Sequence, residues 1–198
     1  LNLCRVVDSV SNTKCPLIQT LRVCVGKGAT AFPFEPQARA RAEMAIYNLR
    51  ATMNSRSAGR SATAAAAYRV GERIEDHRTG LTFDYRARSG VDHVETLAPA
   101  NAPAWVQDRA ALWNAVEAAE TRKNSQVARE IRVALPAELD HGQRVELVRE
   151  FCQREFVARG MVADIALHAP GRTGDDRNHH AHILLTTREI GPEGFGAK

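Results

Sequence analysis

Hydrophobic and polar residues follow a regular pattern only in the part of the chain that begins at residue 44. The stretch "MAIYNLRA" (44–51) is predicted to be a strand, because its apolar run precedes the polar loop "NSRSAGR". Ser61 is a suitable N-cap for a helix from Ala62 to about Asp76, in which four consecutive alanines are strong helix formers. We expect the sequence "RTG" at 78–80 to close that helix.

The middle of the chain predicts a loop followed by a second helix. Residues 81–102 are expected to be extended or looped, and Pro103 is expected to start a helix that runs to about Lys123. The large apolar residues of this helix fall roughly on one face: Trp105, Leu112, Trp113 and Val116.

The last third predicts a strand, a helix and two further strands. The stretch "AREIRVALP" (128–136) alternates in the manner of a strand, with Ile131, Val133 and Leu135 on one face and Glu130, Arg132 and Ala134 on the other. Residues 139–159 form the predicted third helix, with Gly160 as its C-cap. The strands "VADIALH" (162–168) and "HAHILLTTRE" (180–189) flank the loop "APGRTGDDRN".

The order strand, helix, helix, strand, helix, strand, strand, with short connections, predicts an α+β domain with a central antiparallel sheet and packed helices. We assign this domain to residues 44–198. Residues 1–43 have no sustained period and are expected to be an irregular extension outside the domain. The extension is either flexible or, in the reading we favour, not part of the natural protein, which would start at Met44.

Composition narrows the class of protein. The 198 residues are 44% hydrophobic, which suffices for one well-cored domain. No apolar run of about 18 residues is present, so no membrane insertion is expected. The N-terminus lacks the pattern of a signal peptide. The four cysteines form no CxxC pair and indicate reduced thiols in a cytoplasmic protein: Cys4, Cys15, Cys24 and Cys152.

The net charge of +4 is uninformative, because residues 44–198 hold 21 basic and 20 acidic residues. Residues 50–88, however, carry eight arginines against four acids. A local excess of arginine points modestly toward phosphate as a ligand.

Three histidines are candidates for a metal site. His180 and His182 share a face of their strand, and His168 lies directly or diagonally opposite His180 if the two strands pair antiparallel across the loop. Three imidazoles held in this way would leave open metal positions for water or substrate. A His-x-His pair alone is more often structural, and the third histidine shifts the balance toward a metal. His179 faces the other way, and the remaining histidines are expected in loops or at helix ends: His77, His93 and His141.

Tyr68 lies among alanines in the first predicted helix, and its position alone would favour a core residue. A phenol is a weak nucleophile near neutral pH unless a cation stabilises its anion or the transition state.

From Met44 to Lys198 the sequence resembles the relaxase domain of the MobA/MobL family, particularly the plasmid conjugal-transfer relaxases of the TraA type. The matching stretches are "MAIYNL", "SAGRSATAAAAYRVGERIEDHRTG", "PANAPAW", "ALPAEL" and "HHAHILLTTREIGPEGFGAK". These relaxases belong to the His-hydrophobic-His endonuclease superfamily, whose central antiparallel sheet agrees with the predicted element order.

The resemblance implies that Tyr68 attacks one phosphodiester of single-stranded plasmid transfer-origin DNA, giving a 5′-phosphotyrosyl link and a free 3′-hydroxyl. It also implies that His168, His180 and His182 hold a divalent metal, Mg²⁺ or Mn²⁺, and that Glu130 orients a ligand or accepts the tyrosine proton. Four arginines either contact DNA or form a solvated surface: Arg56, Arg60, Arg69 and Arg73. Accessory relaxosome proteins and a type IV secretion coupling protein are the implied protein partners.

The sequence departs from the family pattern at three places. Complete relatives often continue into a helicase or another C-terminal region, whereas this sequence stops at "EGFGAK", so the resemblance implies a truncated gene product or an isolated domain. The other two departures lie near the expected site. His179 replaces a proline, and Arg132 stands where many relatives carry a second acid. Two alternatives therefore remain, a catalytically degenerate DNA-binding remnant of a relaxase and a related rolling-circle replication initiator or transposase.

Overall fold

The computed structural model describes residues 48–171, 175–196 and 198. The predicted extension 1–43 lies outside these residues, as do the first four residues of the predicted strand 44–51.

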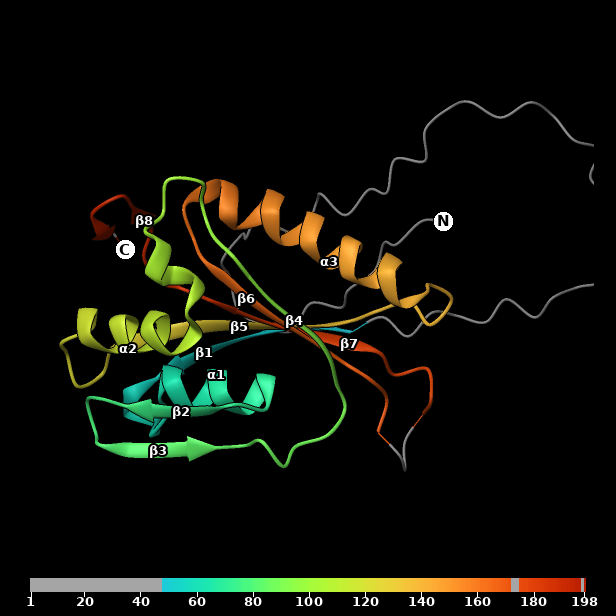
Figure 1. Cartoon of the computed structure of the whole chain (residues 1–198), viewed down its shortest axis with the longest axis horizontal. Helices are drawn as coiled ribbons and strands as arrows, with labels where there is room; N and C mark the ends of the chain where they lie inside the picture. The colour runs from blue at the N-terminus through green and yellow to red at the C-terminus, as the bar shows by residue number, and fades with distance from the viewer. Residues whose placement is uncertain (1–47, 172–174, 197) are drawn as a thin grey trace, which may run out of the picture. The chain divides into compact units, whose positions relative to one another are not determined.

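The elements follow the chain in the order shown in Figure 1. The strands are β1 (Leu49–Ser55), β2 (Arg73–Asp76), β3 (Leu81–Asp84), β4 (Val91–Leu97), β5 (Gln126–Ala134), β6 (Ala163–His168), β7 (His180–Leu185), β8 (Ile190–Gly191) and β9 (Gly194–Phe195). The α-helices are α1 (Ala62–Val70), α2 (Arg109–Ala119) and α3 (His141–Glu155), and the 3₁₀ turns are η2 (Arg56–Ala58), η3 (Ala104–Gln107) and η4 (Val157–Arg159).

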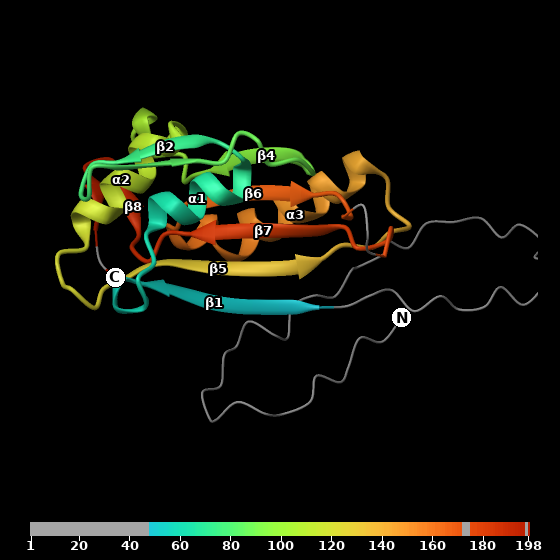
Figure 2. The ribbon, with the colours of Figure 1, turned by 90° about the horizontal axis from the view of Figure 1, so that it is seen from below.

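The described part of the chain is built on a five-stranded sheet in the order β1-β5-β7-β6-β4, with every neighbouring pair antiparallel. Figure 2 shows this sheet with α1 in front and α3 behind. In Figure 1 the helix α3 lies above the sheet, whereas α1, α2 and the β2–β3 hairpin lie below it. The predicted α+β fold with a central antiparallel sheet is confirmed.

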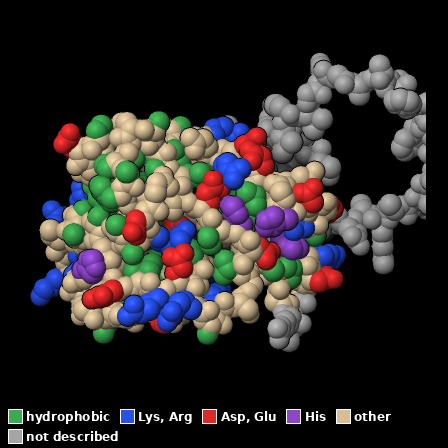
Figure 3. All heavy atoms as spheres, in the orientation of Figure 1, with side chains coloured by type: hydrophobic (Ala, Val, Ile, Leu, Met, Phe, Trp, Pro, Cys, Tyr) green, Lys and Arg blue, Asp and Glu red, His purple; other side chains and the backbone are tan. Residues whose placement is uncertain are grey.

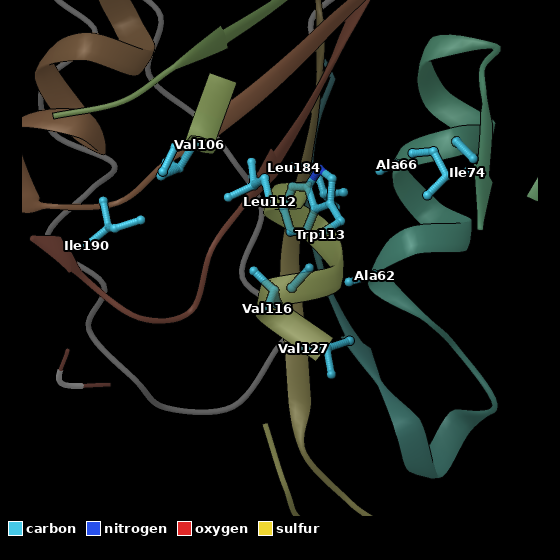
Figure 4. Close-up of a cluster of buried hydrophobic side chains, with 13 residues drawn as sticks. Ala62, Ala66, Ile74, Val106, Leu112, Trp113, Val116, Val127, Leu184 and Ile190 are labelled. Atoms are coloured by element: carbon cyan, nitrogen blue, oxygen red, sulfur yellow. The ribbon is translucent and has the colours of Figure 1, made fainter. Parts of the chain in front are cut away.

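The two faces of the sheet carry separate hydrophobic cores, because neighbouring strand residues point to opposite sides. Leu184 of β7 packs with Leu112 and Trp113 of α2, as Figure 4 shows, whereas Ile183 and Leu185 pack toward α3. All five side chains are essentially fully buried. Burial of each contributes roughly 1.5–3 kcal/mol relative to exposure, so each face is held by its own helical layer.

The first helix ends earlier than predicted. The predicted helix from Ala62 to Asp76 is wrong beyond Val70, where Gly71 takes a φ of +71° and donates its N–H to the carbonyl of Ala67 at 3.0 Å. A left-handed residue at this position stops a helix, and glycine adopts it without strain. The following residues form β2, which pairs with β3, so "RTG" turns a hairpin rather than closing a helix.

Other boundaries also differ. The region 81–102 contains β3 and β4, so His93 lies in a strand and not in the predicted loop. The predicted helix 103–123 consists of η3 and α2, because Asp108 caps a new helix by accepting from the N–H of Ala111 at 3.0 Å. The predicted helix 139–159 consists of α3 and η4, and its C-cap at Gly160 is confirmed.

Two further observations bear on the sequence predictions. None of the helices among the described residues is long and apolar enough to cross a bilayer. Cys152 is a free, buried thiol, and burial raises its pKa to about 12. The other three cysteines lie outside the described residues.

Candidate metal centre and nucleophile

The sheet brings three histidines to one point. In the β6–β7 pair His168 lies directly opposite His180, and Ala166 lies opposite His182, as the predicted register requires. The ring centroids are 4.8 to 5.3 Å apart. One ligand nitrogen from each ring lies within 4.8 Å of the other two, so the cluster can hold a metal ion. Figure 3 shows in purple the histidine side chains that reach one face of the molecule, without separating this cluster from the other histidines.

The hydrogen bonds of two of these rings fix where their protons are. His168 Nε2 lies 2.7 Å from the carbonyl oxygen of Arg69, and His180 Nδ1 lies 3.0 Å from the carbonyl oxygen of Asn178. A carbonyl oxygen can only accept, so each of these nitrogens must carry the proton. His168 Nδ1 and His180 Nε2 therefore keep their lone pairs, which is the state of a metal ligand.

Glu130 fixes the third ring in the same way. Its carboxylate accepts from His182 Nδ1 at 2.8 Å and from Arg69 Nε at 2.6 Å, with a second bond from Arg69 Nη2. Burial alone would raise the pKa of Glu130, but the hydrogen bonds from His182 and Arg69 outweigh it and lower the pKa to about 2. The ionised carboxylate holds the proton of His182 on Nδ1 and leaves Nε2 free to bind a metal.

The site also favours neutral imidazoles. Burial lowers the pKa of His168 to about 4 and lowers the pKa of His180 as well, with the neighbouring positive groups acting in the same direction. Near neutral pH these two rings are therefore uncharged, and a metal does not have to displace a proton from them.

Tyr68 lies in the last turn of α1 and is not a core residue, because its side chain is 44% exposed. Its ring packs edge-to-face on Tyr85 with 5.2 Å between centroids, and the guanidinium carbon of Arg88 lies 4.0 Å from its ring centroid. Such a stacked cation stabilises negative charge that develops on a phenol.

Arg88 connects the tyrosine to the histidines. Its Nη2 lies 3.4 Å from His168 Nδ1, so one guanidinium touches both the candidate nucleophile and a candidate ligand. Arg88 and Tyr85 belong to the loop between β3 and β4, where the N–H of Arg88 donates to the carbonyl of Tyr85 at 2.9 Å. No role for either residue could be predicted from the sequence, because only the β2–β3 hairpin brings this loop to α1.

Two of the four arginines expected to contact DNA are engaged inside the protein. Arg56 forms an ion pair of 2.7 Å with the buried Glu117, and its side chain is only 10% exposed. It also donates to backbone carbonyls at the C-terminal end of α2, a position that favours positive charge. Arg69 pairs with Glu130, as described above. These contacts indicate a structural role for Arg56, and they hold Arg69 beside the three histidines.

The other two arginines are available at the surface. Arg60 is exposed and makes one bond of 3.3 Å to the side chain of Asn54. Arg73 is exposed on β2, opposite Asp84 of β3.

His179 lies apart from the cluster, as its strand position predicts. Its Nδ1 is 3.2 Å from Arg144 Nη1 of α3, the helix that covers the opposite face of the sheet. Burial lowers the pKa of His179. His93 and His141 form a separate pair with ring centroids 6.3 Å apart.

Comparisons with known proteins identify a family and several relatives of this chain. Residues 60–198 match the MobA/MobL family. The chain is 43% identical over 173 residues to the mobilization protein MobL of Acidithiobacillus ferridurans and 40% identical over 166 residues to the probable conjugal transfer protein TraA of Sinorhizobium fredii. These matches cover 76% and 78% of this chain but 45% and 14% of the relatives, so the chain spans less than half their length.

A solved structure described as "Molecular Basis of Vancomycin Resistance Transfer in Staphylococcus aureus" has a similar fold. The two chains superpose with a TM-score of 0.71 at 37% sequence identity, and the match covers 78% of this chain and 77% of the other.

Proposed function

Because the chain belongs to the MobA/MobL family of mobilisation and conjugal-transfer relaxases, we propose that it nicks and rejoins one strand of plasmid transfer-origin DNA. The intermediate is a 5′-phosphotyrosyl link to Tyr68. The observation that carries this proposal is the cluster of His168, His180 and His182 beside an exposed tyrosine. Each ring holds its proton on the nitrogen bonded to a carbonyl or to Glu130, so its other nitrogen is unprotonated, and that of His168 accepts from Arg88 at 3.4 Å.

The three histidines would hold the metal, for which Mg²⁺ or Mn²⁺ is the expected choice. Ligand nitrogens within 4.8 Å of one another and fixed tautomers fit a three-imidazole site. A divalent cation held by these three residues would supply Lewis-acid stabilisation of the phosphate and would offset the weakness of a phenol as a nucleophile.

The chemical step exchanges one phosphoester bond for another. The hydroxyl oxygen of Tyr68 forms a bond to phosphorus, the bond from phosphorus to the 3′-oxygen breaks, and that oxygen takes up a proton. The phenolic proton passes to solvent, which reaches the half-exposed tyrosine, while Arg88 stabilises the charge left on the ring. Attack by the 3′-hydroxyl on the phosphotyrosine reverses the step without ATP.

Glu130 acts as a positioning residue rather than as the base. Its pKa of about 2 makes it a poor proton acceptor, and its carboxylate is already bonded to His182 and Arg69. Of the two roles that the family resemblance implied for Glu130, these contacts support the orientation of a ligand.

Single-stranded transfer-origin DNA is the proposed substrate, and Arg60 and Arg73 are the two of the four sequence-predicted arginines that are exposed to contact it. The proposal includes accessory relaxosome proteins and a type IV secretion coupling protein as partners, in the cytoplasm.

The test is the formation of a covalent protein–DNA adduct. The protein is incubated with Mn²⁺ and a labelled single-stranded oligonucleotide that carries a plasmid transfer origin, and SDS-resistant adducts are resolved on a gel. We expect an adduct that EDTA prevents and that Tyr68→Phe abolishes without loss of DNA binding. Tyr85→Phe is the matched control, since it removes a hydroxyl from the neighbouring ring and should leave the adduct intact.

The outcomes separate the candidate functions. An adduct that persists in Tyr68→Phe would reject Tyr68 as the nucleophile. DNA binding with no adduct from the unaltered protein would favour the catalytically degenerate remnant instead.

A further inference from the structure

A row of side chains crosses the sheet from the metal cluster to the β1 edge. Arg132 of β5 lies directly opposite His182 of β7, and Arg50 of β1 lies directly opposite Arg132. Directly opposed residues of antiparallel strands point to the same face, so both arginines share the face of the histidine cluster. Both are exposed. With strands spaced about 4.8 Å apart, the row extends roughly 10 Å from His182.

The two arginines have no acidic partner among the ion pairs of the described residues. Like charges directly opposite each other on neighbouring strands are destabilising. The repulsion between the two arginines therefore lowers the stability of the folded protein, and a bound anion would offset this loss.

Arg132 also lines an open hollow of about 260 Å³ beside the metal cluster. Its other lining residues are Asn48, Ala134, Asp175, Asn178 and His180. Since His180 belongs to the metal cluster as well, the hollow and the cluster are contiguous. The one acid in the lining, Asp175, forms an ion pair of 2.9 Å with Arg177, so its charge is compensated.

The layout around the cluster restricts the direction of a bound strand. Tyr68 lies in the last turn of α1 with Arg88 of the β3–β4 loop stacked on its ring, and in Figure 2 this helix lies in front of the sheet beside β6 and β7. The ends of β5 and β1 that carry Arg132 and Arg50 have no described helix in front of them in that view. A strand held between Tyr68 and the histidines can continue across β5 and β1.

We propose that Arg132 and Arg50 bind phosphates of the DNA strand as it leaves the metal cluster across β5 and β1. This inference rests on the proposed function, because it takes the cluster as the point where the strand is cut. The contacts are to the DNA backbone and carry no sequence preference.

The salt dependence of binding tests the proposal. Binding of a labelled single-stranded oligothymidylate is measured by fluorescence anisotropy over a range of NaCl concentrations. For single strands the slope of log K against log salt becomes shallower by about 0.7 for each phosphate that the protein no longer neutralises. Arg132→Gln and Arg50→Gln should each reduce the slope by about 0.7, and the double variant by about 1.4. Each single change should weaken binding about fourfold near 0.15 M salt.

Arg154→Gln is the matched control. It removes the same charge from an exposed arginine of α3, on the opposite face, and should leave the slope unchanged.

Thermal unfolding provides a second readout. A structural role for Arg132 would make Arg132→Gln less stable, whereas removal of one member of a like-charged pair should leave the melting temperature unchanged or higher.

The possible failures are distinguishable. Unchanged slopes in both arginine variants, with adduct formation by the unaltered protein intact, would overturn this inference and leave the proposed function standing. Failure of the unaltered protein to form the adduct or to bind the oligonucleotide would overturn both.

Discussion

At the scale of single residues, the site depends on charged side chains that each serve two neighbours. Glu130 bonds both His182 and Arg69, and Arg88 stacks on Tyr68 while its Nη2 lies 3.4 Å from His168. Glu130 favours a bound cation through its charge and through the tautomer it imposes. Arg88 opposes a cation at His168 but favours an anionic tyrosine. The two residues therefore have opposite effects on metal binding.

Because Arg88 should disfavour metal binding but favour the anionic tyrosine, its effect on the reaction can be tested separately from its effect on metal binding. Arg88→Ala should slow adduct formation about tenfold, because it removes a cation–π interaction of about 1–2 kcal/mol. Its affinity for Mn²⁺, measured by calorimetry, should stay the same or rise, since a positive group 3.4 Å from a ligand nitrogen is removed. Arg88→Lys keeps the charge without the planar stacking and should be intermediate.

The control is Arg86→Ala in the same loop. Arg86 is exposed and pairs with Asp84, so its loss should change neither the rate nor the metal affinity. A loss of rate in Arg88→Ala that matches a loss of Mn²⁺ binding would contradict the role given to Arg88.

At the scale of elements, α1 places Tyr68, and the β2–β3 hairpin holds the start of α1. The buried carboxylate of Asp76 at the end of β2 accepts from the hydroxyls of Ser61 at 2.8 Å and Thr63 at 2.6 Å, and from the N–H of Thr79 at 3.0 Å. The same Ser61 hydroxyl caps the helix by accepting from the N–H of Ala64. One carboxylate thus joins the helix start to the hairpin.

Asp76→Asn should destabilise the protein at neutral pH by about 1–3 kcal/mol, because the amide cannot accept all three bonds. Burial alone would raise the pKa of Asp76, but the bonds from Thr63, Ser61 and Thr79 lower it below 3.8. A lowered folded pKa means that this stability is present above the unfolded pKa and is lost as the pH falls through the folded value. The difference between the two proteins should therefore shrink below about pH 4.

Urea unfolding at neutral and acid pH measures both effects. Asp84→Asn on the paired strand is the control, because the carboxylate of Asp84 is at the surface and bonds mainly to Arg86. It should leave the unfolding midpoint nearly unchanged. A pH-independent difference between the unaltered protein and Asp76→Asn would contradict the account.

The same hairpin shows which elements the sequence predicts and which it does not. The two-residue period places His180 and His182 on one face of their strand, and antiparallel pairing brings His168 directly or diagonally opposite His180, so the cluster was predictable although its register was not. The end of α1 was signalled by Gly71 and by the alternation of Arg73, Ile74, Glu75 and Asp76, but the preceding alanines favoured a longer helix. Arg88 could not be found, since its contact with Tyr68 arises only after hairpin and helix pack together.

At the scale of the whole molecule, the cluster of three histidines joins parts of the chain that are far apart in sequence. The candidate ligands lie on β6 and β7, and the groups that fix their tautomers come from α1, β5 and the loop before β7. The cluster lies on the α1 side of the sheet, while α3 and its core cover the other side. A bound ion would therefore stabilise the folded arrangement of several elements at once and not one local segment.

This arrangement predicts that Mn²⁺ raises the melting temperature of the unaltered protein, a readout that needs no DNA and no catalysis. A ligand that binds only the folded state at 100 times its Kd adds about 2.7 kcal/mol of stability. His168→Ala and His182→Ala should each abolish the rise, because two imidazoles hold the ion too weakly. His179→Ala should retain it, since His179 contacts Arg144 of α3 and lies outside the cluster. His93→Ala tests the other histidine pair and should also retain it. If the rise in melting temperature persisted in His168→Ala and disappeared in His93→Ala, the metal would bind at His93 and His141 instead. Tyr68 would then have no metal ion beside it, which would contradict the proposed site.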